Sequence, residues 1–166
     1  MTTMTVEQRI STAQWMLERQ LYWASQAEVK VGAVVTTDIA MLAGLFAAYA
    51  HDKSTVTPWG MVFSAFFVVP IFLAVLFAAI ALIPRLSPAP HKSGLFFGEI
   101  SQQGAHDFVE ATRKKTPDEI LDDWLYQVHR NAQIADLKHK WVKRAVMLSF
   151  VGSLAWALAV YCLIRF

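Results

Sequence analysis

One carboxylate, Asp38, lies within a largely apolar stretch of the sequence, residues 31–50. It follows Lys30 by eight positions, which is about 12 Å along a helix at ~1.5 Å per residue. A charged side chain at membrane depth is costly and normally faces a bundle interior or water. Asp38 could therefore line a polar pore or switch helix packing. Alternatively, it could be a structural group bonded to Thr37, Ser149 or Ser153.

A second set of residues, at the borders of the apolar stretches, has the chemistry of an anion-binding site. Lys and Arg bind phosphate oxygens, and an aromatic ring can stack on a base. The candidate ligand-binding residues are Glu28, Lys30, Phe97 (or its neighbour Phe96), Arg130 and Lys138. Snorkelling of Lys and Arg at a membrane border, together with ordinary salt bridges, explains the same residues without a ligand.

Small residues recur every fourth position in two apolar stretches, as Ala40-x-x-x-Gly44-x-x-x-Ala48 and Ser149-x-x-x-Ser153-x-x-x-Ala157. This spacing lets membrane helices approach closely. It fits oligomer assembly, and it also fits packing within one subunit. The candidate pore or helix-packing residues are Asp38, Gly44, Ser149 and Ser153.

The sequence contains no pattern for catalysis, a metal or a cofactor. It has no HExxH, no Gly-rich phosphate loop and no Ser/His/Asp set. His129 and His139 would point to different faces of one helix, which is poor geometry for zinc. An intramembrane enzyme that used Asp38 would need a second catalytic group, and only Thr and Ser are available there. We therefore expect a protein that is not an enzyme.

The composition predicts a membrane protein. Of the 166 residues, 55% are apolar and only 17% are charged, and the mean hydropathy is +0.37. A soluble domain has roughly 25% charged residues. The net charge of +2 and the scattered basic residues do not suggest a nucleic-acid polymer as partner.

Three apolar segments are long enough to cross a bilayer as helices. We expect a single all-α membrane domain over 1–166. Its predicted parts are a cytoplasmic helix 6–30, the spans 31–50, 59–83 and 145–164, and a cytoplasmic region 84–144. Of the 15 Lys and Arg residues, all but Lys53 and Arg165 fall on one side of these spans. The positive-inside rule then places the N-terminus in the cytoplasm and the C-terminus outside.

The sequence predicts two cytoplasmic helices, each of which continues into a membrane span. Apolar residues recur at helical spacing over 6–28, and no Pro or Gly separates them from the first span, so one helix should run from Val6 to Ala50. Thr116-Pro117-Asp118-Glu119 is a capping-box start for a helix that continues into the third span. The two helices would form a cytoplasmic stalk, and the region between spans two and three would be a hairpin with a short helix at Ser101–Arg113.

Several short motifs resemble the Pycsar effector transmembrane family. Ala27-Glu28-Val29-Lys30 is similar to the family's Ala-Asp-x-Lys, with Glu28 where the family has Asp. The other similar motifs, in the family's order over about 27–164, are Pro84-Arg85, Leu95-Phe96-Phe97-Gly98-Glu99-Ile100, and Gln127, His129, Ile134, Ala135 and Lys138.

The resemblance implies an antiphage effector of the bacterial inner membrane. In such systems a cyclase makes cCMP or cUMP on infection, and the effector then damages the membrane and stops growth. We therefore expect a cyclic nucleotide, the bilayer and further copies of the chain as partners. The alternative is a non-enzymatic scaffold or transporter subunit whose stalk docks a cytoplasmic partner.

Overall fold

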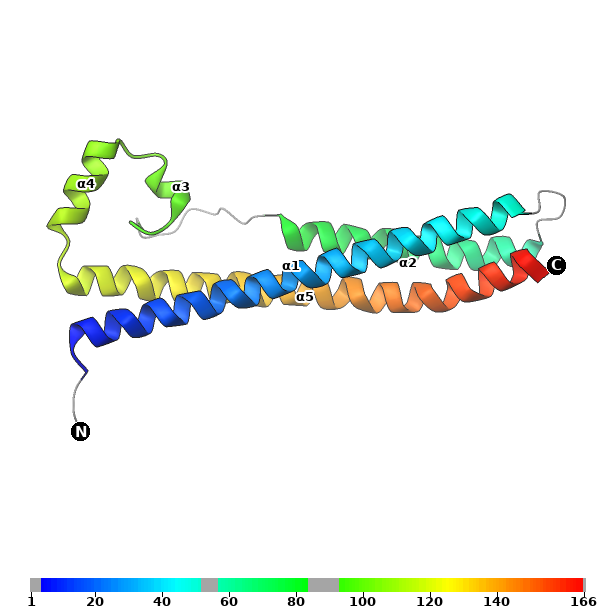
Figure 1. Cartoon of the computed structure of the whole chain (residues 1–166), viewed down its shortest axis with the longest axis horizontal. Helices are drawn as coiled ribbons and strands as arrows, with labels where there is room; N and C mark the ends of the chain where they lie inside the picture. Colours follow the sequence, from blue (N-terminus) through cyan, green and yellow to red (C-terminus); the bar gives the residue numbers. More distant parts are fainter. Residues whose placement is uncertain (1–3, 52–56, 84–92, 166) are drawn as a thin grey trace. The chain divides into compact units, whose positions relative to one another are not determined.

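The structure is a computed structural model that describes residues 4–51, 57–83 and 93–165. These residues form five helices and no strand (Figure 1). The helices are α1 (Val6–His51), α2 (Pro58–Leu82), α3 (Phe97–Ile100), α4 (Ala105–Lys114) and α5 (Pro117–Arg165). The expected all-α fold and its two long helices are confirmed. Lys53 and the Pro84-Arg85 motif lie outside the described residues.

The three long helices start with side-chain caps. Thr116 and Glu119 form the expected capping box: the Glu119 carboxylate accepts from the Thr116 N–H at 2.7 Å, and the Thr116 hydroxyl accepts from the Glu119 N–H at 3.3 Å. Thr5 and Gln8 make the same reciprocal pair at the start of α1. At α2, the Thr57 hydroxyl accepts from the Gly60 N–H at 3.2 Å. Each cap satisfies an N–H group that the helix itself leaves unpaired.

The region expected as one short helix, Ser101–Arg113, is divided differently. α3 ends at Ile100, and α4 begins only after Gly104, whose backbone is extended. Glycine is the weakest helix former after proline, so the turn around Gly104 interrupts the helical path. Asp107 in the first turn of α4 and Lys114 in its last turn match the helix dipole.

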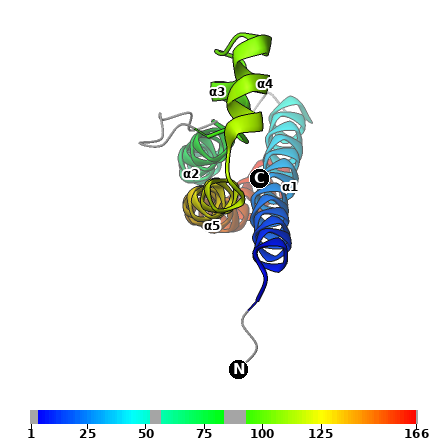
Figure 2. The same ribbon diagram turned by 90° about the vertical axis from the view of Figure 1, so that its left-hand side faces the viewer.

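The described contacts divide the chain into two compact units. The head unit contains the described residues 4–25 and 93–136, with the first part of α1, all of α3 and α4, and the first part of α5. The bundle unit contains the described residues 26–51, 57–83 and 137–165, with the rest of α1 and α5 and all of α2. Both α1 and α5 continue without interruption from one unit into the other (Figures 1 and 2).

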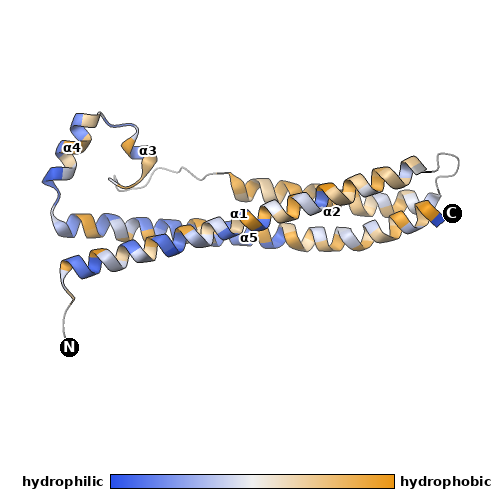
Figure 3. Cartoon of the chain, in the orientation of Figure 1, coloured by the Kyte–Doolittle hydropathy of each residue, from blue (hydrophilic) through white to orange (hydrophobic). Residues whose placement is uncertain are grey.

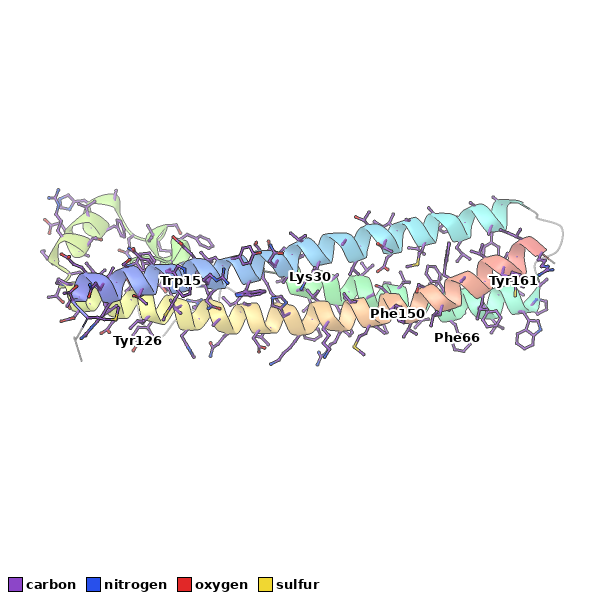
Figure 4. The ribbon with its side chains drawn as sticks, turned by 60° about the horizontal axis from the view of Figure 1, so that its bottom comes forward. Trp15, Lys30, Phe66, Tyr126, Phe150 and Tyr161 are labelled. Atoms are coloured by element: carbon purple, nitrogen blue, oxygen red, sulfur yellow. The ribbon has the colours of Figure 1, made fainter. Side chains whose placement is uncertain are left out.

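The bundle unit is a three-helix arrangement with an apolar interior and an apolar exterior. Its two core clusters take residues from all three helices: Met41, Leu45, Ala48, Phe67, Ile71, Ala159 and Leu163 in one, and Ala27, Val31, Ala78, Ala81, Val142 and Ala145 in the other. Phe66 and Phe150 point away from the helices and are 66% and 68% exposed (Figure 4). An exterior of this kind suits lipid rather than water.

Among the residues that the structure describes, three helices are long and apolar enough to cross a membrane, namely α1, α2 and α5. Figure 3 shows that α2 and the bundle-unit parts of α1 and α5 are the most hydrophobic, while α4 and the first parts of α1 and α5 are largely hydrophilic. This distribution agrees with the three expected spans.

Candidate functional site

Asp38 is fully buried in the bundle unit. Its Oδ2 accepts a hydrogen bond of 3.0 Å from the hydroxyl of Ser149, which connects α1 to α5. Its Oδ1 has no hydrogen-bond partner among the described residues. The predicted partners Thr37 and Ser153 bond elsewhere, to the carbonyls of Ala33 and Phe150 in their own helices. A buried carboxylate oxygen without a donor is costly, so Asp38 is an energetically unfavourable polar group inside this part of the bundle.

Gly44 lies where α1 meets the indole of Trp156 on α5. A Cβ placed on Gly44 would lie 3.1 Å from Cζ2 of Trp156. The Trp156 Nε1–H donates to the carbonyl of Met41 at 2.7 Å. The glycine thus makes room for an aromatic ring that also hydrogen-bonds across the helices, and the role of the small-residue spacing in assembly or in packing stays a prediction.

Two of the predicted ligand-binding residues form an ion pair in the bundle unit. The Lys138 ammonium on α5 bonds the carboxylate of Glu28 on α1. The side chain of Lys138 is 15% exposed, and that of Glu28 is 50% exposed. Lys30, two positions further along α1, is exposed. The ionic explanation given for Glu28 and Lys138 from the sequence therefore agrees with their contacts.

The other two predicted ligand-binding residues belong to the head unit. The guanidinium of Arg130 on α5 lies 4.6 Å from the ring centroid of Phe96, at cation–π distance. Phe97 packs against Phe96, with the two ring centroids 4.9 Å apart, and is itself 67% exposed. The five predicted residues are thus divided between the two units, and their role in binding stays a prediction.

The head unit also contains a buried polar network that the sequence analysis missed. Asp123 on α5 is 2% exposed. Its Oδ2 accepts from the Gly94 N–H at 2.8 Å and from the Lys115 ammonium at 3.0 Å. Burial alone would raise the pKa of Asp123, but the hydrogen bonds from Ser93, Lys115 and Gly94 outweigh it and lower the pKa below its usual value. The carboxylate is therefore ionised and holds the chain around residue 94 against α5.

A cleft of about 490 Å³ lies next to this network, within the head unit. Most of its lining residues have polar side chains, although carbon atoms make up most of the surface exposed in it; the lining residues are Ser93, Gly94, Glu99, Gln102, Gln103, Asp107, Phe108, Ala111, Thr112 and Lys115. This volume is in the range of small-molecule sites in proteins. Its wall is fixed in part by the Ser93 N–H, which donates to the carboxylate of Glu99.

The sequence did contain a signal for the missed network. Asp123 falls on the helix face that also carries the apolar Ile120, three positions earlier, and the buried Gln127, four positions later. An acidic residue on a face that is otherwise buried needs a partner, and a lysine follows the short helix eight positions earlier. The sequence could not show that the partner also includes the backbone of Gly94, 29 residues away.

These features define a helical membrane protein with three candidate spans and a polar head unit. A profile of the Pycsar effector protein domain family (PycTM) matches residues 12–165. The chain belongs to this family, and the resemblance seen in its motifs is confirmed.

A curated relative is the Pycsar effector protein SaPycTM of Staphylococcus aureus. It is 24% identical over 90 residues, which cover 54% of this chain and 56% of the relative. The chain thus spans about half the length of the curated relative that it matches. No solved structure matches the chain significantly.

Proposed function

We propose that this protein is an antiphage effector that a cyclic nucleotide activates and that then disrupts the integrity of the inner membrane. The observation that carries the proposal is the match to the Pycsar effector family over residues 12–165, a range that includes all three candidate spans. The signal is cCMP or cUMP. The chain responds to the nucleotide without converting it, and the infected cell stops growing.

The charge distribution supports an orientation for this activity. The N-terminus and residues 84–144 are in the cytoplasm, where they meet the nucleotide, and the C-terminus is outside. The cytoplasmic parts carry Arg9, Arg19 and Lys30 before the first span and ten Lys and Arg residues within 84–144. The aromatic residues Trp141 and Tyr161 mark the inner and outer borders of the third span.

Several copies of the chain assemble to form the lesion. Apolar side chains fill the described core of the bundle, and Asp38 is fully buried there, so we place the path for ions between copies rather than within one bundle. A water-filled path requires polar groups such as Asp38 and Ser149 to turn toward a lumen between copies. Gly44 and Ser153 belong to the same helix-packing set.

Activation travels along α1 and α5, the two helices that have residues in both units. A nucleotide can shift the protein only if it binds one arrangement of the helices more tightly than the other. The head unit offers Phe97 and Arg130 for the ligand, and the Glu28–Lys138 pair with Lys30 stands at the start of the bundle-unit segments.

The test is membrane depolarisation in bacterial cells that express the protein. We expect depolarisation and dye uptake within minutes after a cyclase that makes cCMP or cUMP is induced, and none in cells that lack either protein. If the membrane potential holds while the nucleotide accumulates, the effector proposal is wrong. Recovery of a stable partner protein under those conditions would then favour the scaffold alternative.

A further inference from the structure

The cleft of the head unit has a chemistry that distinguishes between the two candidate nucleotides. From its lining we infer that the cleft is the nucleotide site and that it selects a cytosine base over uracil, so that cCMP is the signal. This inference rests on the proposed function, because it assumes that a cyclic pyrimidine nucleotide is the ligand.

The charge of the lining excludes a site built on phosphate binding alone. Two carboxylates, those of Glu99 and Asp107, line the cleft together with one ammonium, that of Lys115. Lys115 is already paired with Asp123, at 3.0 Å. An ammonium has three N–H donors, so this pair leaves Lys115 able to donate to a cyclic phosphate, which carries a single negative charge. The carboxylates of Glu99 and Asp107 would repel the phosphate, so they must face the uncharged part of the ligand.

The base is the part of the ligand that these carboxylates can recognise. A carboxylate accepts from the exocyclic amine of cytosine, which presents two hydrogens at the edge of the ring. Uracil has a carbonyl oxygen in place of that amine, and its single ring N–H is flanked on both sides by carbonyl oxygens that repel a carboxylate. Phe108 supplies an aromatic face for stacking, which either base can use.

The cleft wall is held in a fixed geometry, as base recognition requires. The Leu95 N–H donates to the Ser93 hydroxyl at 3.1 Å, and the Gly94 N–H donates to Asp123 at 2.8 Å. A Cβ on Gly94 would lie 3.1 Å from Nζ of Lys115. The chain therefore passes close to the Lys115 ammonium at Gly94, while the neighbouring Ser93 N–H donates to the Glu99 carboxylate, so both charged groups contact the same short segment.

The test compares cCMP with cUMP in equilibrium binding to the purified full-length protein in detergent. We expect cCMP to bind at least about tenfold more tightly than cUMP, the usual discrimination from a good hydrogen-bond pair to a base edge. Asp107→Asn and Glu99→Gln each offer an amide in place of a carboxylate, so at least one of them should reduce the ratio to about threefold or less. Glu110→Gln is the matched control, because Glu110 is on the same helix as Asp107 and pairs with Lys114 outside the cleft.

The outcomes separate this inference from the proposed function. If cUMP binds equally well or better and depolarises cells, the effector function stands and the cytosine inference is wrong. If cCMP is preferred but both cleft variants keep the wild-type ratio of the two affinities, the effector function also stands, and the assignment of base selection to this cleft is wrong. If neither nucleotide binds, the proposed function and this inference fail together.

Discussion

The hydroxyl of Ser149 on α5 donates to Oδ2 of Asp38 on α1 at 3.0 Å, in the middle of segments that are otherwise apolar. The carboxylate is completely buried, and its second oxygen has no partner among the residues that the structure describes. A polar pair of this kind links two helices in lipid, where a carboxylate is costly and is often functional.

The Ser149–Asp38 bond should stabilise the bundle unit measurably. Ser149→Ala removes the donor to Oδ2, so neither oxygen of Asp38 has a donor among the described residues, and we expect a loss of about 1–3 kcal/mol in the free energy of unfolding. Thermal unfolding in detergent would measure it. Ser153→Ala is the control, because the Ser153 hydroxyl bonds Phe150 in its own helix, and we expect a change within about 0.5 kcal/mol. Equal effects of the two changes would contradict the role assigned to the pair.

The glycines of the bundle unit should differ in their tolerance of a methyl group. A Cβ on Gly152 would lie 2.8 Å from Cδ1 of Ile71, whereas a Cβ on Gly32 would meet nothing within 4 Å. We expect Gly152→Ala to destabilise the fold by about 1–3 kcal/mol through overpacking. Gly32→Ala should be neutral or stabilise by up to about 1 kcal/mol, because alanine is the better helix former. Melting temperatures in one detergent would settle the comparison, and a stable Gly152→Ala protein would contradict the packing.

The helices were largely predictable from the sequence because their signals are local. The box formed by Thr116 and Glu119 is four residues long, and the continuity of α1 follows from the lack of any Pro or Gly between Val6 and the start of the first span at Val31. The break between α3 and α4 was missed, although Gly104 marks it, because a single glycine does not always end a helix.

The candidate sites were predictable only in part, because their contacts join distant segments. Asp38 and Ser149 were singled out by their polarity inside apolar segments, and Ser149 was one of three partners considered for the carboxylate. The link between Asp123 and Gly94 was missed, because a backbone N–H carries no signature in the sequence. The buried Lys115–Asp123 pair was likewise hidden among charged residues that look solvated.

The head unit should lose stability in acid through Asp123. Its pKa is lowered by folding from the usual 3.8, so its contribution is complete above that value and is lost as the pH falls below it. The Gly94 amide donates to this carboxylate. We expect its hydrogen exchange, corrected for the intrinsic rate, to become faster as the pH falls below the usual pKa of 3.8. Asp123→Asn should show a weaker dependence on pH. Identical profiles for the two proteins would contradict the assignment.

The ion pair of Glu28 and Lys138 should show charge-reversal rescue. Glu28→Lys or Lys138→Glu places like charges together on α1 and α5, and we expect each to lower stability by about 1 kcal/mol and to change the threshold of activation. The double reversal restores an opposite pair and should recover most of the loss. Unfolding and depolarisation assays on the four proteins form a double-mutant cycle. If the effects of the two single reversals simply add in the double variant, the ion pair has no role in stability or in activation.

The central claim, that a cyclic nucleotide makes this protein permeabilise a membrane, is tested most directly with purified components. The protein is reconstituted into sealed phospholipid vesicles with its head unit outward and a fluorescent dye trapped inside. We predict that cCMP releases the dye, that vesicles without protein stay sealed, and that cUMP is at least about tenfold less potent. Vesicles that remain sealed with both nucleotides, although the protein binds one of them, would contradict the account.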